Sequence, residues 1–181
     1  MRESRTSAFR VPATISLPAL LNGQSDGQFR GLIRDLLTVA RRLETARDYF
    51  GRRIDVTGPQ YTLLMTVAQH QGATGVSVGS VAQAIHVSSA FVTAESGKLC
   101  RTGLLEKLPN PEDHRGALLR LTSTGRTKLD WLAAEIRSVN DLFFGLLSVR
   151  SFNELCAGAA ALVRGSREAL QYITGVEEEP E

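Results

Sequence analysis

The stretch VSVGSVAQAIHVSSAFVTAESGKLCRTGLLEKL, residues 76–108, decides the fold of this 181-residue chain. Its apolar spacing predicts two short helices separated by a tight turn. Ser77 can cap the first helix and Ser88 or Ser89 the second, because a serine hydroxyl accepts a hydrogen bond from a free backbone N–H of the first turn. Gly103 ends the second helix.

A β-hairpin is predicted directly after these helices. Residues 104–108 and 117–121 are two apolar runs compatible with strands. The segment PNPEDHRG, residues 109–116, lies between them and is too long for a two-residue turn. The order helix, turn, helix, hairpin is that of a winged helix-turn-helix.

Long amphipathic helices are predicted on both sides of this region. Residues 28–55 hold seven arginines and four acidic residues, and an apolar stripe on one face lies opposite a face that carries Arg30, Arg34, Arg41, Arg42 and Arg52. Residues 57–70 form a second helix behind Thr57-Gly58-Pro59. Two further helices are predicted over 124–173, the last capped by Ser151, with inward stripes that run from Leu129 to Leu147 and from Phe152 to Ile173.

The chain therefore divides into five parts, and its fold is mainly α with a small β-hairpin. Residues 1–27 are a flexible arm, 28–56 a dimerisation helix, 57–123 the winged helix-turn-helix, 124–174 the C-terminal dimerisation helices and 175–181 an acidic tail. A small winged domain cannot bury all the apolar faces of the terminal helices, whereas a dimer interface can. An intramolecular bundle is the alternative.

The composition bounds the class of protein. The chain is 43% hydrophobic and 22% charged with a net charge of +2, which is typical of a globular protein. Two cysteines and the lack of an apolar run of about 18 residues predict a cytoplasmic protein with reduced thiols and no membrane partner. His70, His86 and His114 have no metal-ligand spacing, and no nucleophile or phosphate-loop motif occurs, so we expect no catalytic residues, metal or cofactor.

The predicted order of elements favours DNA as the partner. The second short helix fits a major groove, which is wide enough for one helix. Arg115 lies at the hairpin tip, where it can enter a narrow minor groove, and Asp113 can orient its guanidinium. The alternative is that both are solvated turn residues.

Residues 57–125 resemble the MarR family of winged helix-turn-helix transcriptional regulators. The resemblance rests on the ordered motifs LCRTGLL over 99–105, Asp113-His114-Arg115, and LRLTSTG over 119–125. It implies a homodimeric repressor on a pseudo-palindromic operator in double-stranded DNA, with the segment from Ser88 to Lys98 in the major groove. The DNA-contacting residues it implies are Ser88, Ser89, Ala90, Phe91, Thr93, Lys98, Asp113, His114 and Arg115.

The resemblance also implies release by a small molecule, often a phenol, that binds between the dimerisation and DNA-binding regions. Candidate residues for that pocket are Tyr49, Phe50, Arg53, His70 and Trp131. A core or interface role is the alternative for each of them, as it is for Phe91.

The chain departs from the family pattern in its recognition helix. Ala94 stands where a basic residue is common, and Lys98 is the only cation before Arg101. Glu95 and Gly97 are unusual there, and a mid-helix glycine costs about 1 kcal/mol relative to alanine. Since phosphate neutralisation supplies much of DNA affinity, we expect modest affinity with a shallow salt dependence.

Two alternatives remain open at this point. The first is a dimeric interaction module with weak DNA affinity, which the shortage of cations favours. The second is a thiol-based redox switch at Cys100 or Cys156. Because Cys100 lies late in the recognition helix and Cys156 on an apolar stripe, we expect inert, buried thiols instead.

Overall fold

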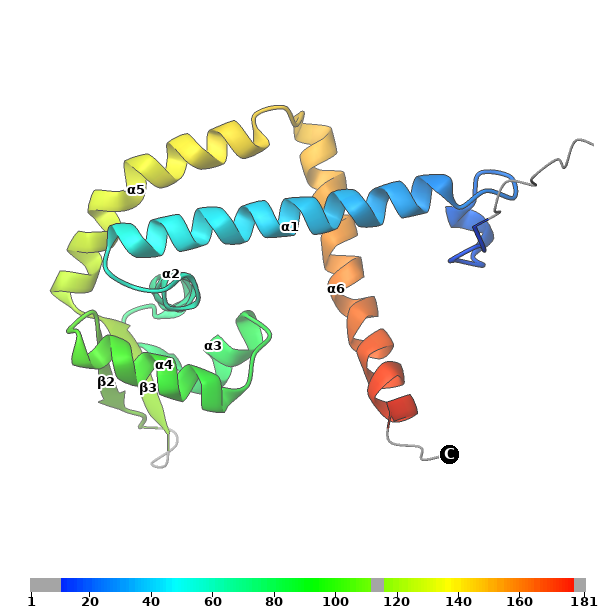
Figure 1. The fold of residues 1–181 in the computed structure, drawn as a ribbon. Helices are drawn as coiled ribbons and strands as arrows, with labels where there is room; N and C mark the ends of the chain where they lie inside the picture. The colour runs from blue at the N-terminus through cyan, green and yellow to red at the C-terminus, as the bar shows by residue number, and fades with distance from the viewer. Residues whose placement is uncertain (1–10, 112–115, 178–181) are drawn as a thin grey trace, which may run out of the picture. The chain divides into compact units, whose positions relative to one another are not determined.

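The computed structural model describes residues 11–111 and 116–177 (Figure 1). Six α-helices and a small sheet make up these residues, and the mainly helical winged fold predicted from the sequence is confirmed. The helices are α1 (Gly27–Arg53), α2 (Gly58–His70), α3 (Val78–Ala84), α4 (Ser89–Arg101), α5 (Ser123–Phe144) and α6 (Val149–Glu177).

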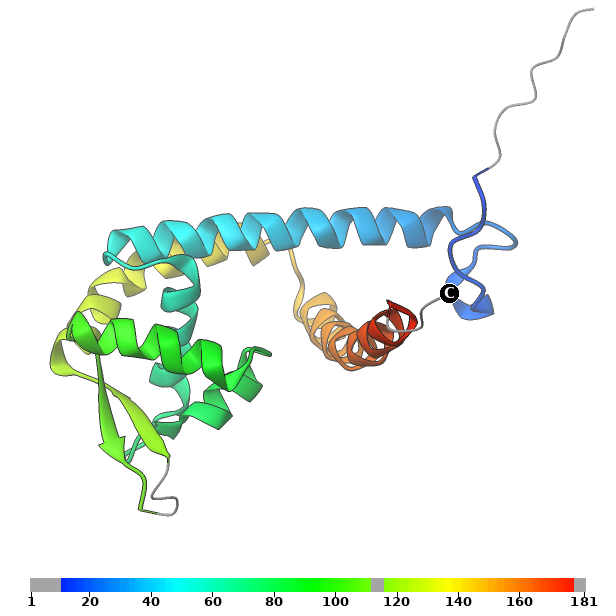
Figure 2. The same cartoon turned by 60° about the horizontal axis from the view of Figure 1, so that its bottom comes forward.

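The sheet has three antiparallel strands: β1 (Val76–Ser77), β2 (Leu105–Pro109) and β3 (Ala117–Leu121), in the order β1-β3-β2. The β2–β3 hairpin is the predicted one, with Lys107 opposite Leu119. Strand β1 was not predicted, because two residues are too few for a periodic pattern. Figure 2 shows the hairpin projecting past α3 and α4.

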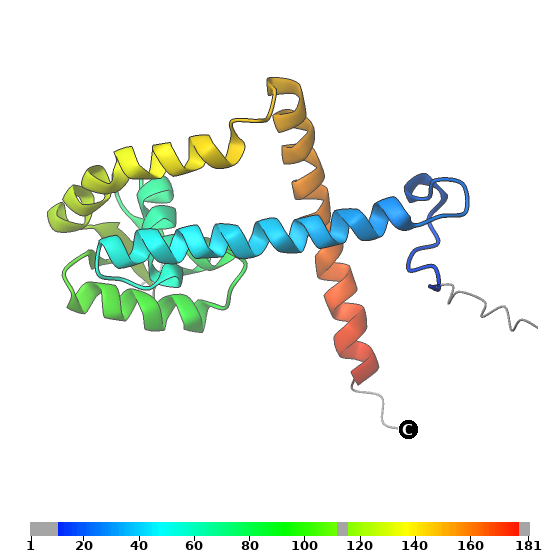
Figure 3. The same cartoon turned by 45° about the horizontal axis from the view of Figure 1, so that its top comes forward.

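The chain forms two compact units, Met1–Leu132 and Ala133–Glu181. In the first, α2 crosses between α1 and α4, and it contacts both (Figure 3). The largest fully buried side chains described in this unit are Leu63, Leu64, Val67, Val81, Val92, Ser96, Leu99, Leu105, Leu119 and Leu132. They come from α2, α3, α4, α5 and the sheet, so one core fixes the helix-turn-helix against the hairpin.

The glycine at the start of α5 is required by close packing. A Cβ atom at Gly125 would collide with the backbone oxygen of Leu104, the residue before β2. The hydroxyl of Thr122 donates to the Gly103 oxygen at 2.6 Å and accepts from the Gly125 N–H at 3.0 Å. The motif LRLTSTG therefore fastens the end of the hairpin to the start of α5.

The last helix begins earlier than the sequence indicated. Ser148, and not Ser151, caps α6: the Ser151 N–H donates to Ser148 Oγ at 3.1 Å, and the Ser148 N–H donates to Ser151 Oγ at 3.0 Å. Both serines can accept a first-turn N–H, and the sequence does not reveal which one precedes the first helical residue.

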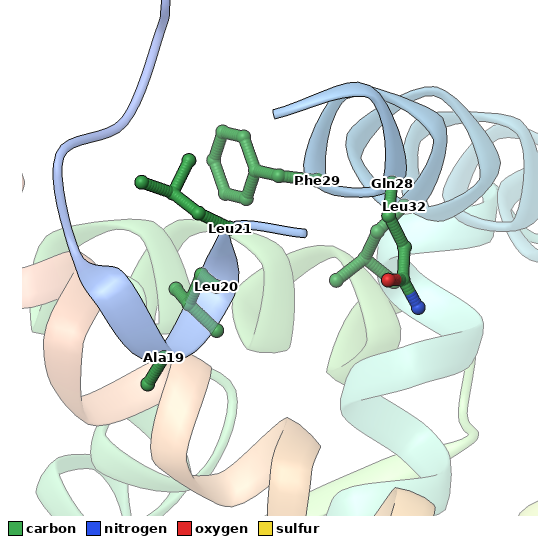
Figure 4. Close-up of a pocket in the computed structure, with 6 residues that line it drawn as sticks. All are labelled: Ala19, Leu20, Leu21, Gln28, Phe29 and Leu32. Carbon is green, nitrogen blue, oxygen red and sulfur yellow. The ribbon is translucent and has the colours of Figure 1, made fainter. Parts of the chain in front are cut away.

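The segment before α1 contains local structure within the predicted arm. A short 3-10 helix, Pro18–Leu20, packs near the start of α1, where Leu20, Leu21, Phe29 and Leu32 line a depression of about 250 Å³ (Figure 4). The buried Asp26 carboxylate accepts hydrogen bonds from the Thr14 N–H and hydroxyl at 2.7 and 2.8 Å.

Large apolar faces remain exposed on the single chain. No side chain of α6 between residues 149 and 175 is buried, so the stripe predicted to point inward lies on its surface. In α1, only Phe50 and Gly51 are buried. Exposed apolar residues of these two helices include Leu32, Ile33, Leu37, Leu43, Phe152, Leu155, Leu162, Val163, Leu170 and Ile173.

Within the described residues, no helix by itself is long and apolar enough to cross a membrane. The bent pair α5 and α6 meets that test only when the two helices are taken together.

Candidate nucleic-acid interface

The helix-turn-helix is held by a cap at each helix start. The Ser77 hydroxyl accepts from the Ser80 N–H at 3.0 Å, and the Ser88 hydroxyl accepts from the Phe91 N–H at 3.1 Å. His86, in the turn, has a positive φ of 55°. The Ser88 hydroxyl hydrogen remains able to donate, because capping uses only an acceptor site of the oxygen.

One face of α4 is fixed in the core and the opposite face is open. Val92, Ser96 and Leu99 are at most 1% exposed. The open face carries five exposed residues of the helix, Ser89, Ala90, Thr93, Ala94 and Lys98, followed by Arg101 at its end. Of the candidate contacts on α4, only Phe91 lies off this face, half-buried beside Ile85 and Val87.

Gly97 has no packing reason within the described structure. A Cβ atom placed there would meet only the Arg101 Nη1 atom, at 3.8 Å, which is ordinary van der Waals contact. An alanine would therefore fit and would favour the helix. Because Gly97 has no side chain, the open face of α4 is lower at this position than it would be with an alanine.

An acidic residue holds the lysine of α4. The Glu95 carboxylate accepts from Lys98 Nζ at 2.6 Å and from Gln60 Nε2 at 2.9 Å. Gln60 also belongs to the capping box of α2, where its Oε1 accepts from the Thr57 N–H at 3.1 Å. These two side-chain hydrogen bonds, the one from Lys98 first, lower the pKa of Glu95 below its usual value, so this carboxylate is charged at neutral pH.

A second cation is paired on the hairpin. Arg120 Nε donates to Glu106 Oε1 at 2.9 Å, and the two residues face each other across β2 and β3. Asp113, His114 and Arg115, the hairpin-tip residues expected to contact DNA, lie outside the described residues.

The structure brings together some of the expected ligand residues. The Arg53 guanidinium carbon lies 4.8 Å from the ring centre of Trp131, which is 57% exposed. Both line a depression of about 300 Å³ with Lys128, whose Nζ donates to the Ile54 oxygen at 2.9 Å and pairs with Asp55 at 3.0 Å.

The other three lie elsewhere. Phe50 is 4% exposed and packs its ring 5.5 Å from Tyr61, so it belongs to the core, as one of the alternatives held. Tyr49 packs against Phe50 at 5.8 Å. His70 is exposed at the far end of α2, nine residues or about 14 Å beyond Tyr61.

Sequence reasoning missed Arg101 as a candidate contact, although its place in the last turn of the recognition helix was a usable signal. The expectation of two buried thiols holds in part for Cys100 and is wrong for Cys156. Cys100 is half-buried, and burial raises its pKa, which disfavours the reactive thiolate. Cys156 is exposed on α6.

Comparison with known proteins agrees with this geometry. Residues 54–116 match the family model described as MarR family. The chain is similar in fold to the transcription regulator MarR from Oenococcus oeni, with 18% identity, a TM-score of 0.65, and coverage of 74% of this chain and 98% of that one.

Two further solved structures contain bound partners. One is M. tuberculosis MosR in complex with DNA, with 20% identity, a TM-score of 0.61 and coverage of 76% and 96% of the two chains. The other is Streptomyces coelicolor PcaV with its natural ligand, with 26% identity, a TM-score of 0.53 and coverage of 72% and 91%. No curated protein sequence matches the chain. Residues 54–116, the winged-helix region, therefore match the MarR family, and the described fold is the one seen in the solved structure of MarR from Oenococcus oeni.

Proposed function

We propose that the protein is a homodimeric repressor that binds a pseudo-palindromic operator through α4 and the hairpin. The observation that carries this proposal is the open face of α4. Its inner side is locked into the core by Val92, Ser96 and Leu99, whereas its outer side offers small and hydroxyl side chains. Such a helix can approach base edges and phosphates closely.

The residues proposed to contact DNA fall into three kinds. Ser88, Ser89 and Thr93 donate hydrogen bonds to phosphates or bases, and Ala90 contacts a thymine methyl group. Lys98 and Arg101 are the two cations of α4 that can reach the phosphate backbone, and Arg101 has no ion pair of its own on this helix among the described residues. At the hairpin tip, Arg115 enters the minor groove with Asp113 orienting it and His114 beside them.

The second copy in the dimer covers the exposed apolar faces of α1 and α6. Exposed apolar surface on this scale is unusual for a monomer and marks an interaction site. A two-fold dimer also sets two α4 helices about one DNA turn apart, roughly 34 Å, which matches a pseudo-palindromic site.

The depression at Trp131 is the proposed effector site. A flat indole surface beside the Arg53 guanidinium suits a planar aromatic anion, such as a phenolic carboxylate. Its walls come from the end of α1 and the first part of α5, so a ligand there touches α1, a helix that the proposed dimer interface also uses.

Fluorescence anisotropy with duplex DNA from the region upstream of the protein's own gene tests the function. We expect the wild-type dimer to bind this duplex at low salt, and Arg115→Ala to weaken binding to all sequences. Failure of the wild-type dimer to bind any duplex would overturn the proposal and favour a dimeric interaction module.

A further inference from the structure

We propose that Glu95 restrains DNA binding by holding Lys98 in an ion pair within the recognition helix. This inference rests on the proposed function, since it concerns how tightly the same helix engages DNA. It assigns to Glu95 the role of a positioning residue that sets affinity without contacting the DNA itself.

The geometry gives Lys98 an intramolecular partner that competes with phosphate. Its Nζ lies 2.6 Å from Glu95 Oε1, and residues three apart lie on the same side of a helix. Lys98 is 52% exposed but Glu95 only 14%. The lysine is therefore drawn from the edge of the open face toward α2, and a phosphate must displace or share the carboxylate to use its charge.

Glu95 is itself held in place, so it does not follow the lysine to DNA. Gln60 donates to its second oxygen at 2.9 Å, and Gln60 is fixed by the capping box of α2. The buried neighbours Val92 and Ser96 hold the helix backbone on both sides of this position. The carboxylate is thus anchored to α2, while the Lys98 side chain is the part able to move.

Lys98 provides half of the positive charge on α4, so its ion pair with Glu95 removes a large share of the charge that this helix can offer to DNA. The helix carries two cations, Lys98 and Arg101, and one anion, Glu95. With Lys98 neutralised, Arg101 is the only cation of α4 that remains to release counterions from the phosphate backbone. The pairing of Arg120 with Glu106 on the hairpin reduces the available positive charge further.

The test is Glu95→Gln, which removes the charge and keeps an oxygen that accepts from Gln60. We expect tighter binding to duplex DNA from upstream of the gene. Freeing one lysine per recognition helix should add about 0.9 to the salt slope for each helix. Between about 50 and 200 mM salt, the variant dimer should then lose roughly tenfold more affinity than wild type does.

Asp35→Asn is the matched control, because it removes one carboxylate from an exposed ion pair on α1 and leaves α4 unchanged. Lys98→Gln gives an independent reading. In the wild type it should change the salt slope little, and in the Glu95→Gln background it should abolish the gain. The unfolding midpoint of each variant checks that the fold is intact.

The possible results separate this proposal from the function on which it rests. If the wild type binds no duplex, the proposed function fails. If the wild type binds and Glu95→Gln binds no more tightly, or less tightly, the role of Glu95 is overturned. The role of Glu95 is also overturned if Lys98→Gln alone lowers the salt slope by the full increment of about 0.9 per helix. Lys98 would then already be engaged with phosphate in the wild type.

Discussion

At the scale of single residues, the recognition helix shows where folding and function make different demands. Val92, Ser96 and Leu99 are buried in the core and hold one side of the helix in place. Gly97 serves no contact in the described structure, and Glu95 takes a lysine away from the open face. Both oddities were visible in the sequence, but only their neighbours reveal what they do.

Gly97→Ala should make the protein more stable and a weaker DNA binder. A methyl group fits at this position, so the free energy of unfolding should rise by about 1 kcal/mol. The same methyl group stands on the face that approaches DNA. Urea unfolding and fluorescence anisotropy measure the two effects.

Gly31→Ala is the matched control, because a Cβ there also meets only an arginine side chain, Arg34 at 3.7 Å. It should stabilise the protein similarly and leave DNA binding unchanged. Unchanged DNA binding in Gly97→Ala would show that this turn of α4 stays away from the groove.

Asp26 should make the segment before α1 sensitive to acid. Hydrogen bonds from the Thr14 N–H first, then from its hydroxyl, and the Arg30 charge hold the pKa of Asp26 below its usual value. Arg30 Nη1 lies 2.8 Å from the carboxylate as an ion pair, though its N–H is not aimed for a hydrogen bond. The stabilisation is complete above the unfolded pKa, about 3.9, and is lost as the pH falls through the lower folded value.

We therefore expect the amide signal of Thr14 in NMR spectra to move toward its unfolded position only below about pH 4. Asp26→Asn should remove this pH response. A Thr14 signal that does not change on acidification would mean that the carboxylate does not anchor the segment.

At the scale of elements, periodicity located the six described α-helices but missed the 3-10 helix Pro18–Leu20, and pairing and capping details came from the structure. Strand β1 exists because Val76 and Ser77 pair with Leu119 and Leu118 of β3, far along the chain. The start of α6 depends on which of two serines adopts the capping conformation. Both facts depend on partners rather than on a local pattern.

Leu162→Glu in α6 should break the dimer. Leu162 is 52% exposed in the single chain, and two buried leucines contribute at least about 3 kcal/mol at roughly 1.5 kcal/mol each. Sedimentation velocity should show a shift to monomer, with DNA affinity falling in parallel because the two half-sites are no longer bound together.

Asn153→Asp provides the control, since it adds the same charge nine residues earlier, on the opposite side of α6. It should leave the dimer intact. If Leu162→Glu also remains a dimer, the apolar face of α6 is not the interface.

At the scale of the whole molecule, the effector proposal links a surface site to DNA release. Trp131 is the only tryptophan, so its fluorescence reports directly on the depression beside Arg53. We expect 2-hydroxybenzoate to quench it and to lower DNA affinity over the same concentration range. Typical coupling between two such sites changes affinity by 5- to 150-fold, or about 1–3 kcal/mol.

Arg53→Gln should weaken both responses, whereas Arg52→Gln, a neighbouring exposed arginine, should not. Quenching without any change in DNA affinity would show a binding site that is not coupled to DNA. The lack of quenching at millimolar concentrations would exclude this class of ligand.

The sequence by itself determined the winged fold and the order of its main elements, because these follow from local periodicity, capping and turn residues. Only the tertiary structure decided that Glu95 holds Lys98 through an anchor on α2, that Phe50 is core, and that Arg53 and Trp131 meet. Gln60 and Glu95 are 35 residues apart, and Arg53 and Trp131 are 78 apart. Contacts of this kind depend on how the helices cross in the folded protein, and a local sequence pattern does not predict that crossing.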